Sequence, residues 1–236
     1  MGKFDLIRTD WKKLESEETD QMKKMERPAL FKEIPDNAVL IDLIPYGKIK
    51  IGNKPLLETI YDRRSKRSGS DQPLTLEELS YLLFCTNGVK NQARPMFRTV
   101  PSAGARHAIE TYLQVERVET LKKGVYRYLP LTHQLVYLKE GSLNEAIEGF
   151  LGQNFNADVM FFWTAVPYRM QYRYGSASEK LILLDAGHVC QNLYLACDAI
   201  GLGACAIGAY DQEKLDWYLE LDTEKEVVIY NATVVK

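Results

Sequence analysis

Ser176-Ala177-Ser178-Glu179-Lys180-Leu181-Ile182-Leu183-Leu184-Asp185 opens the longest helical pattern of the sequence, which continues to Ile200 and stops at Gly201. Ser176 followed by Glu179 is the pattern of a capping box, and glycine is common just after a helix end. Apolar side chains cover most of the circumference: Leu181, Leu183, Leu184, Ala186, Val189, Leu193, Leu195 and Ile200. Such a helix must be covered on all sides. We therefore expect it at the centre of the fold or along the seam of a dimer.

A narrow polar stripe interrupts this apolar surface. Asp185, His188 and Asn192 follow one another at helical spacing. One interpretation is a metal site or a proton relay, and the other is a hydrogen-bonded stripe buried at an interface. Metal ligation normally needs a second cluster of ligands, and His107 and His133 offer no matching spacing. The sequence therefore predicts no metal site here.

The rest of the chain from residue 56 alternates helical and strand patterns. Thr75-Leu76-Glu77-Glu78 is a second capping box, which predicts a helix. Strand patterns occupy residues 109–118, 124–129, 135–138, 158–166, 204–207 and 226–235, and further helices are expected over 143–150 and after Asp211. A turn at 130–133 joins the second and third of these strands, and the first three together predict an antiparallel meander. The sequence predicts an α+β layered domain.

Residues 1–50 differ from the remainder. Residues 11–27 are dense in Lys and Glu with little apolar support, and Pro28, Pro35 and Pro45 interrupt the irregular segment after them. We predict an N-terminal extension over 1–50, partly helical, that lies over the main body or over a partner subunit. The main domain is then 51–236.

Composition excludes several classes of protein. The 236 residues carry 30 Lys and Arg against 32 Asp and Glu, a net charge of −2 that argues against nucleic acid as the main partner. No apolar run approaches the ~18 residues of a membrane helix, and no apolar signal core follows the N-terminus. The four cysteines form no C-x-x-C pair and are typical of buried thiols in a reducing compartment. We expect a cytoplasmic protein without a membrane partner.

Arg63-Arg64-Ser65-Lys66-Arg67, here called the basic cluster, holds four cations and a hydroxyl within five residues. The apolar run over residues 56–61 precedes it and would fix one end against the core. Guanidinium groups form planar forks that suit phosphate, and a serine adds a neutral donor. The basic cluster therefore indicates a compact anion such as a cofactor phosphate, with a solvated charged turn as the alternative.

Pro101-Ser102-Ala103-Gly104-Ala105 is a run of small residues that lets a flat ligand approach the backbone. Ser102 and His107 raise the possibility of a hydrolase. However, the sequence contains neither G-x-S-x-G nor an evident acid that completes a triad, so nucleophilic catalysis is not favoured.

Glycines near residue 205 indicate a second place for a ligand. Gly201 and Gly203 follow a helix and precede a strand, which is the wrong order for a dinucleotide-binding loop. Gly208-Ala209 follows a strand and precedes Asp211, a candidate helix cap. Small residues at that position leave backbone N–H groups open to a ligand.

In this order and spacing the motifs resemble the FMN-binding nitroreductase family and, within it, the SagB-type dehydrogenase branch. The resemblance runs from Leu56 to Lys236. It rests on the basic cluster, Pro101 to His107, Gly124-Val125-Tyr126, Leu184 to Asn192, and Gly201 to Gly208. It implies a layered fold with a central, mainly antiparallel sheet flanked by helices, assembled as an intertwined homodimer.

The resemblance also implies a cofactor site for FMN. Its phosphate and ribityl chain would be held by Arg63 and Arg67, with Arg64 and Ser65 beside them. Pro101, Ser102, Ala103 and Gly104 would reach the flavin from the other subunit, and Gly208 and Ala209 would offer a backbone N–H to flavin N5. Lys236 matches a basic residue that returns to the phosphate. This chain has Val235 where the family usually has a glycine.

The activity implied is a ping-pong hydride transfer through flavin N5, from NAD(P)H to a nitroaromatic, a quinone or a similar acceptor. Flavin carries out the redox step, so no protein nucleophile or metal is required. Azoline-oxidising members carry a Lys-Tyr pair where this chain has Arg173-Tyr174. Arginine stays protonated and is a poor general base, which weakens an azoline dehydrogenase. Tyr174 is either a proton donor or one more packed aromatic residue.

Two other classes of protein remain open at this point. One is a flavin-binding protein without turnover of its own, acting as a partner subunit or a sensor. The other is an interaction protein that uses its basic cluster and binds no flavin.

Overall fold

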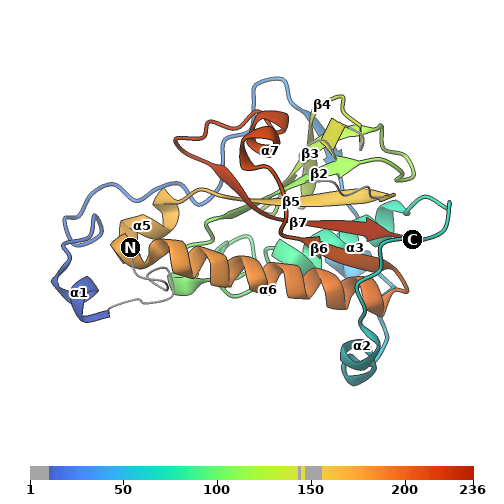
Figure 1. Cartoon of the computed structure of the whole chain (residues 1–236), viewed down its shortest axis with the longest axis horizontal. Coiled ribbons are helices and arrows are strands. Elements are labelled where there is room, and N and C mark those ends of the chain that lie inside the picture. Colours follow the sequence, from blue (N-terminus) through green and yellow to red (C-terminus); the bar gives the residue numbers. More distant parts are fainter. Residues whose placement is uncertain (1–10, 143–144, 147–155) are drawn as a thin grey trace.

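An antiparallel sheet of seven strands organises the part of the chain described by the computed structural model, residues 11–142, 145–146 and 156–236 (Figure 1). The strands are β1 (Val39–Asp42), β2 (Ile109–Val115), β3 (Gly124–Leu129), β4 (Gln134–Lys139), β5 (Val159–Ala165), β6 (Gly203–Ile207) and β7 (Val227–Val235). Their order is β1-β4-β3-β2-β5-β7-β6, and every neighbouring pair runs antiparallel. The expected antiparallel sheet and its β3–β4 meander are confirmed, although β2 ends three residues before residue 118.

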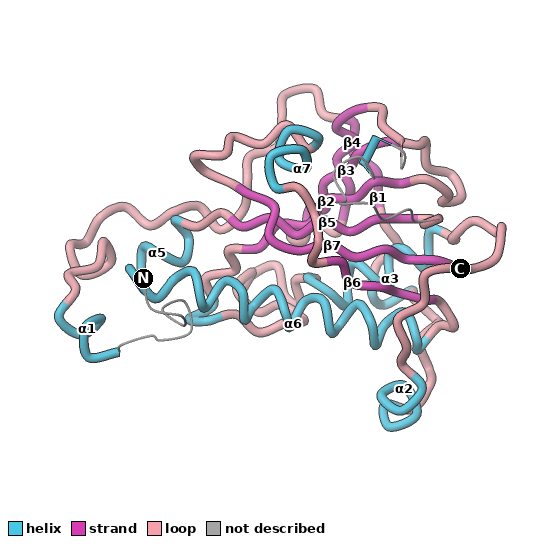
Figure 2. The backbone as a smooth tube through the Cα atoms, in the orientation of Figure 1, coloured by secondary structure: helices cyan, strands magenta, loops and turns pink. Residues whose placement is uncertain are grey.

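Helices cover both faces of this sheet, which confirms the layered α+β architecture. They are α1 (Trp11–Ser16), α2 (Leu56–Asp62), α3 (Leu76–Asn87), α5 (Tyr168–Tyr174), α6 (Ser178–Ala199) and α7 (Gln212–Tyr218). α3 and α6 pack on one face, and α7 lies on the other (Figures 1 and 2). The helix expected over residues 143–150 falls mainly on residues outside the described part of the chain.

The central strand β5 shows why two helical layers are needed. Phe161 and Trp163 belong to the core under α3 and α6, whereas Met160 and Phe162 belong to the core under α7. Successive side chains of a strand point to opposite faces, so an unbroken apolar strand is apolar on both sides. All of these side chains are fully buried.

The expected cap of α6 is wrong, whereas two other caps are confirmed. α6 begins at Ser178, and Ser176 lies in a 3₁₀ turn where its hydroxyl bonds the Glu17 carboxylate at 2.7 Å. The N-terminal segment therefore takes the serine that would have capped the helix. The Thr75–Glu78 capping box of α3 and the Asp211 cap of α7 both form. At the other end of α6, Gly201 adopts φ = 79°, as a glycine after a helix does.

Within one chain, α6 is buried on one side only. Leu183 and Leu184 are 54% and 53% exposed on the other side. α2 projects away from the body near the C-terminal end of α6 (Figure 2). Its Leu57 and Tyr61 are each 79% exposed. Two helices thus present apolar side chains that this chain alone does not cover.

The N-terminal segment is bound to the body more closely than its composition indicates. β1, a strand that the sequence did not predict, pairs with β4. Further along the chain, the α5 side chains Arg169 and Tyr172 bond the carbonyl oxygens of Ala29 and Met25. In the part of the chain that the structure describes, no helix is long and apolar enough to cross a membrane.

Candidate functional site

The basic cluster lies against the N-terminal end of β6, the edge strand of the sheet. Ser65 forms a parallel bridge with Ala204, and the Lys66 N–H donates to the Ala204 carbonyl at 3.0 Å. Gly203 permits this approach, because a Cβ built on it would lie 2.5 Å from the Lys66 Cβ. The cluster backbone therefore extends the sheet by one short segment beyond β6.

The side chains of the basic cluster are available to an anion. The Arg63 guanidinium lies 5.4 Å from the centre of the Tyr194 ring, and Arg67 is exposed. Arg64 turns back and donates to the carbonyls of Tyr61 and Arg63, at the end of α2. Among the described residues, no acidic side chain forms an ion pair with any of the four cations. This uncompensated charge is the first requirement of a phosphate site.

Tyr194 joins the cluster to the strand, and the sequence reasoning missed it. Its hydroxyl accepts the Ala206 N–H at 2.7 Å and lies 3.1 Å from the Ser65 hydroxyl. One side chain of α6 thus fixes both the ring under Arg63 and the edge of β6. Only its place on an apolar helix was visible in the sequence, and that place gave no functional signal.

Gly208 and Ala209 lie at the opposite end of β6 from the basic cluster. Both are exposed, and a Cβ on Gly208 would meet no heavy atom within 4 Å. Ala204 and Ala206 direct backbone groups away from β7, to Lys66 and Tyr194. Because alternate residues of a strand direct their backbone groups to the same edge, residue 208 should also direct its backbone groups away from β7. The five residues of β6 span about 17 Å. The cations of the basic cluster and the open turn at Gly208 therefore lie along the same edge of the sheet, separated by about the length of this strand.

The Pro101–Gly104 loop lies elsewhere along α6. The Ala103 N–H donates to the buried Asp185 carboxylate at 3.2 Å, whereas the basic cluster contacts Tyr194. Asp185 and Tyr194 lie nine positions apart on α6, about 14 Å along the helix axis. Gly104 and Ala105 both adopt positive φ, of 54° and 51°. The structure therefore holds a strained, exposed loop away from the basic cluster of its own chain.

Ser102 and His107 do not form a nucleophile and base. The Ser102 hydroxyl accepts the backbone N–H of His107 at 2.9 Å, and the His107 ring Nε2 lies 2.8 Å from the Met96 carbonyl. Both groups thus shape the loop. Burial and the nearby Arg98 lower the pKa of His107 to about 4.

This buried histidine predicts a loss of stability in mild acid. The folded state holds His107 neutral down to about pH 4, whereas the unfolded chain takes up a proton near pH 6.5. The free energy of unfolding should therefore fall as pH falls through this window, by roughly 3 kcal/mol in total. Urea unfolding across it measures the slope. His107→Gln should give a shallower slope, and an unchanged slope would exclude His107 as its source.

Tyr174 and Lys236 lie in different places. The Tyr174 hydroxyl would be 2.6 Å from a Cβ on Gly104, so this tyrosine borders the Pro101–Gly104 loop. The Lys236 ammonium donates to Glu78 at 2.9 Å, and its carbonyl accepts the Ser70 N–H. Lys236 would therefore have to leave Glu78 to reach a phosphate.

The polar stripe of α6 serves separate neighbours. Asp185 holds the Ala103 N–H, Asn192 donates to the Cys85 carbonyl at 2.9 Å, and His188 is exposed. Burial raises the pKa of Asp185. Among the described residues, no group of three or more His, Cys, Asp or Glu could hold a metal ion.

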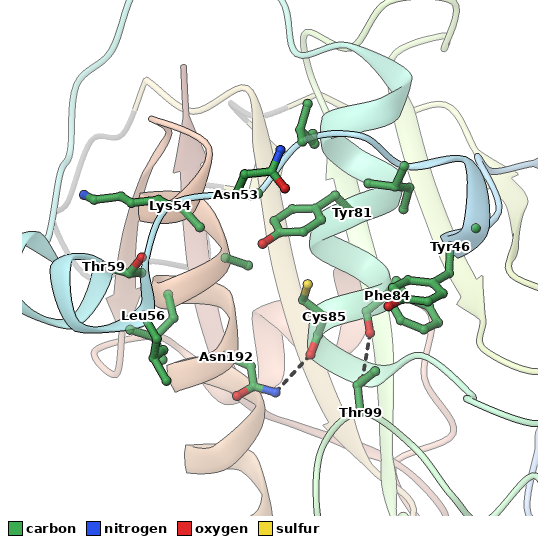
Figure 3. A pocket seen from close by; sticks show the side chains of 17 residues that line it. Tyr46, Asn53, Lys54, Leu56, Thr59, Tyr81, Phe84, Cys85, Thr99 and Asn192 are labelled. Carbon is green, nitrogen blue, oxygen red and sulfur yellow. Dashed lines mark hydrogen bonds between the residues drawn. The ribbon is translucent and has the colours of Figure 1, made fainter.

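A cavity of about 720 Å³ lies between α2, α3 and α6 (Figure 3). None of the site residues predicted from the sequence lines it. Several of its polar groups already have partners: Lys54 pairs with Asp62 and Asp198, Asn192 bonds the Cys85 carbonyl, and Thr99 bonds the Phe84 carbonyl. These pairings leave the cavity with little to hold a charged ligand, so we place the candidate site along β6.

Comparison with known proteins agrees with this fold. The sequence profile of the Nitroreductase family matches residues 60–234, which is most of the chain. A protein of Methanocaldococcus jannaschii whose name describes a nitroreductase is 36% identical over 162 residues, covering 67% of this chain and 81% of that protein. The chain therefore belongs to the nitroreductase family, a family of oxidoreductase enzymes that typically bind flavin, are commonly dimeric and use nicotinamide reductants.

Solved structures show the same fold. A protein of Ralstonia eutropha JMP134 whose name describes a nitroreductase superposes on this chain with a TM-score of 0.74. The two are 28% identical, and the match covers 89% of this chain and 93% of that one. A second, from Desulfovibrio desulfuricans and solved in complex with FMN, gives a TM-score of 0.53 at 17% identity over 78% and 86% of the two chains. At 17% identity, the second comparison shows only that the two proteins share a fold.

Proposed function

We propose that this protein is an FMN-dependent oxidoreductase that transfers a hydride by a ping-pong mechanism, from NAD(P)H to a nitroaromatic, a quinone or a similar small acceptor. One observation carries the proposal. Four cations without ion pairs to described residues and an open glycine turn lie at opposite ends of one edge strand, a spacing suited to a phosphate joined by a chain to a flat ring. The described residues therefore fit FMN.

Each part of this edge has its own task. Arg63 and Arg67 hold the phosphate dianion, and Ser65 adds a neutral donor beside them. Gly208 and Ala209 leave room for a flat ring and direct a backbone N–H to flavin N5. When bound, FMN supplies the two-electron hydride chemistry, and the chain binds it, orients it and limits the access of water. Lys236 joins the phosphate only if it leaves Glu78.

We further propose an intertwined homodimer in which Pro101, Ser102, Ala103 and Gly104 meet the flavin of the partner. The loop is exposed, is held by α6 and lies away from the basic cluster of its own chain. The exposed apolar side chains of α2 and α6 support the same assembly, since a second chain would cover them. Tyr174, which borders the loop, is then close enough to the partner's flavin to donate a proton to a substrate.

Leu184→Glu tests this dimer. On a free surface such a change alters stability by no more than about 0.5 kcal/mol, whereas a carboxylate buried in a seam costs several kcal/mol. We expect the variant to become monomeric and to lose its flavin, as measured by light scattering and by absorbance. Trp217→Glu is the control, because Trp217 is 80% exposed on α7. A variant that stays dimeric would place the seam elsewhere.

The donor and the acceptor are tested in separate half-reactions. Anaerobic NADH or NADPH is expected to bleach the visible flavin band, and a quinone or nitroaromatic added afterwards is expected to restore it. A band that neither nicotinamide bleaches would favour a flavin-binding protein without turnover. Colourless protein that releases no FMN on denaturation would favour an interaction protein that uses the basic cluster.

The SagB-type branch belongs to the same proposal at a finer level. Arg173 is exposed and stands where azoline-oxidising members carry a lysine, and arginine is a poor general base. This favours a nicotinamide-driven reductase over an azoline dehydrogenase. A thiazoline peptide that bleaches the flavin faster than NADPH does would reverse that preference.

A further inference from the structure

Arg106 is a buried cation without a counter-charge among the described residues. Its side chain is 5% exposed, and its Nε is buried without a hydrogen-bond partner in that part of the chain. No acidic side chain of the described residues forms an ion pair with it. The centre of the Tyr172 ring lies 5.7 Å from the guanidinium carbon. Burying a cation is costly unless something pairs with it, so this arrangement favours an anion as the partner of Arg106.

Two more arginines face the same place. Burial lowers the pKa of Arg106, and the nearby charges of Arg27 and Arg173 lower it further. Both are exposed, and neither forms an ion pair with a described residue. The Arg173 guanidinium lies 5.4 Å from the centre of the Tyr174 ring. Three like charges repel one another, and the structure brings them together from the N-terminal segment, the end of the loop and α5.

Arg106 and Arg173 border the Pro101–Gly104 loop, and Arg27 lies near Arg106. Arg106 follows Gly104 by two residues, and the Arg173 Cδ would lie 3.2 Å from a Cβ on Gly104. Tyr172 and Tyr174 add aromatic surface from the same helix. A group held here would therefore lie beside the loop that, under the proposed function, meets the partner's flavin.

We propose that Arg27, Arg106 and Arg173 form an anion site that binds a carboxylate, sulfonate or phosphate group of a substrate beside the flavin. The proposal rests on the proposed function for the position of the flavin. The anion site itself rests on the unpaired buried arginine and its two cationic neighbours. Such a group could belong to the acceptor or to the pyrophosphate of the nicotinamide donor. The site is separate from the basic cluster, which holds the cofactor.

Calorimetry with inorganic pyrophosphate tests the site directly, on flavin-loaded protein at low ionic strength. Removing one charge-assisted contact should weaken binding by about ten- to a hundredfold. Arg106→Gln and Arg173→Gln should both show this loss, and Arg173→Gln serves if the buried variant fails to fold. Lys225→Gln removes an exposed charge near α7 and should bind as the wild type does. Equal binding by all variants, or none by the wild type, would overturn the proposal.

The half-reactions identify which substrate carries the anion. If it is the acceptor, Arg106→Gln should lower the rate of flavin reoxidation by para-nitrobenzoate about tenfold and leave its uncharged methyl ester unaffected. If it is the donor, the same variant should instead weaken the binding of NADH and NADPH, measured in flavin reduction. Unchanged rates in both arms would contradict a substrate site. Flavin content is measured separately, so a protein without flavin would refute the proposed function. The calorimetry is then repeated on that protein, where the loss of pyrophosphate binding in Arg106→Gln and Arg173→Gln relative to Lys225→Gln still decides the anion site.

Discussion

Replacing Arg63 and Arg67 together by alanine is expected to weaken FMN binding by roughly 10²–10⁴-fold while the protein stays folded. Each guanidinium would donate charge-assisted hydrogen bonds to the phosphate, worth about 1.5–3 kcal/mol apiece. Each 1.4 kcal/mol is tenfold in a dissociation constant. Both side chains lie at the surface, and neither forms an ion pair with a described residue, so their removal costs the fold little.

The measurement is titration of flavin-stripped protein with FMN, followed by quenching of flavin fluorescence. Lys122→Ala combined with Lys225→Ala removes the same charge from exposed positions elsewhere and should bind FMN normally. Riboflavin, which lacks the phosphate, should bind the wild type and the double variant about equally. FMN retained at wild-type affinity would show that the basic cluster is only a solvated turn.

Arg169→Ala is expected to lower the free energy of unfolding by about 3–5 kcal/mol, because it breaks a buried ion pair and leaves a buried carboxylate alone. Arg169 donates to Glu110 at 2.6 Å, and the two side chains are 3% and 7% exposed. The same guanidinium bonds the carbonyls of Ala29 and His107. It thereby ties the N-terminal segment to the residues that follow the Pro101–Gly104 loop.

Thermal unfolding should show this loss as a fall in Tm of roughly 6–20 °C, at 2–4 °C per kcal/mol for a chain of this size. Arg169→Met combined with Glu110→Leu should lose less than the single variant, because it leaves no unpaired charge. Lys225→Ala breaks an exposed pair with Asp222 and should change stability little. A double variant as unstable as Arg169→Ala would mean that the carbonyl contacts dominate.

Local signals explain how much of the fold could be predicted from the sequence. The capping box at Thr75, the cap at Asp211 and the unbroken apolar run of β5 each depend on neighbours in sequence. β1 was missed because it is a short strand with little burial, which leaves no pattern in its own sequence. Only its pairing with β4 identifies it as a strand. The Ser176 cap failed for a related reason, since Glu17 lies far away in sequence but bonds that serine.

The candidate site divides in the same way. The basic cluster and Gly208-Ala209 were predicted because each is contiguous, and the structure adds that they lie at opposite ends of one edge strand. Tyr194 and Arg106 could not be predicted, since a single tyrosine or arginine carries no periodic or compositional signal. Their importance comes from the groups that folding brings beside them. Tyr194 lies beside the Ser65 hydroxyl, and Arg106 lies near two other arginines.

The most direct measurement of the central claim is the absorption spectrum of the purified protein, together with identification of whatever flavin it releases on denaturation. We predict yellow protein that releases FMN, about one per chain, and a double Arg63→Ala, Arg67→Ala variant that is purified colourless and dimeric. A wild-type protein that is colourless and fails to bind added FMN would contradict the account, as would a double variant that keeps its full flavin content.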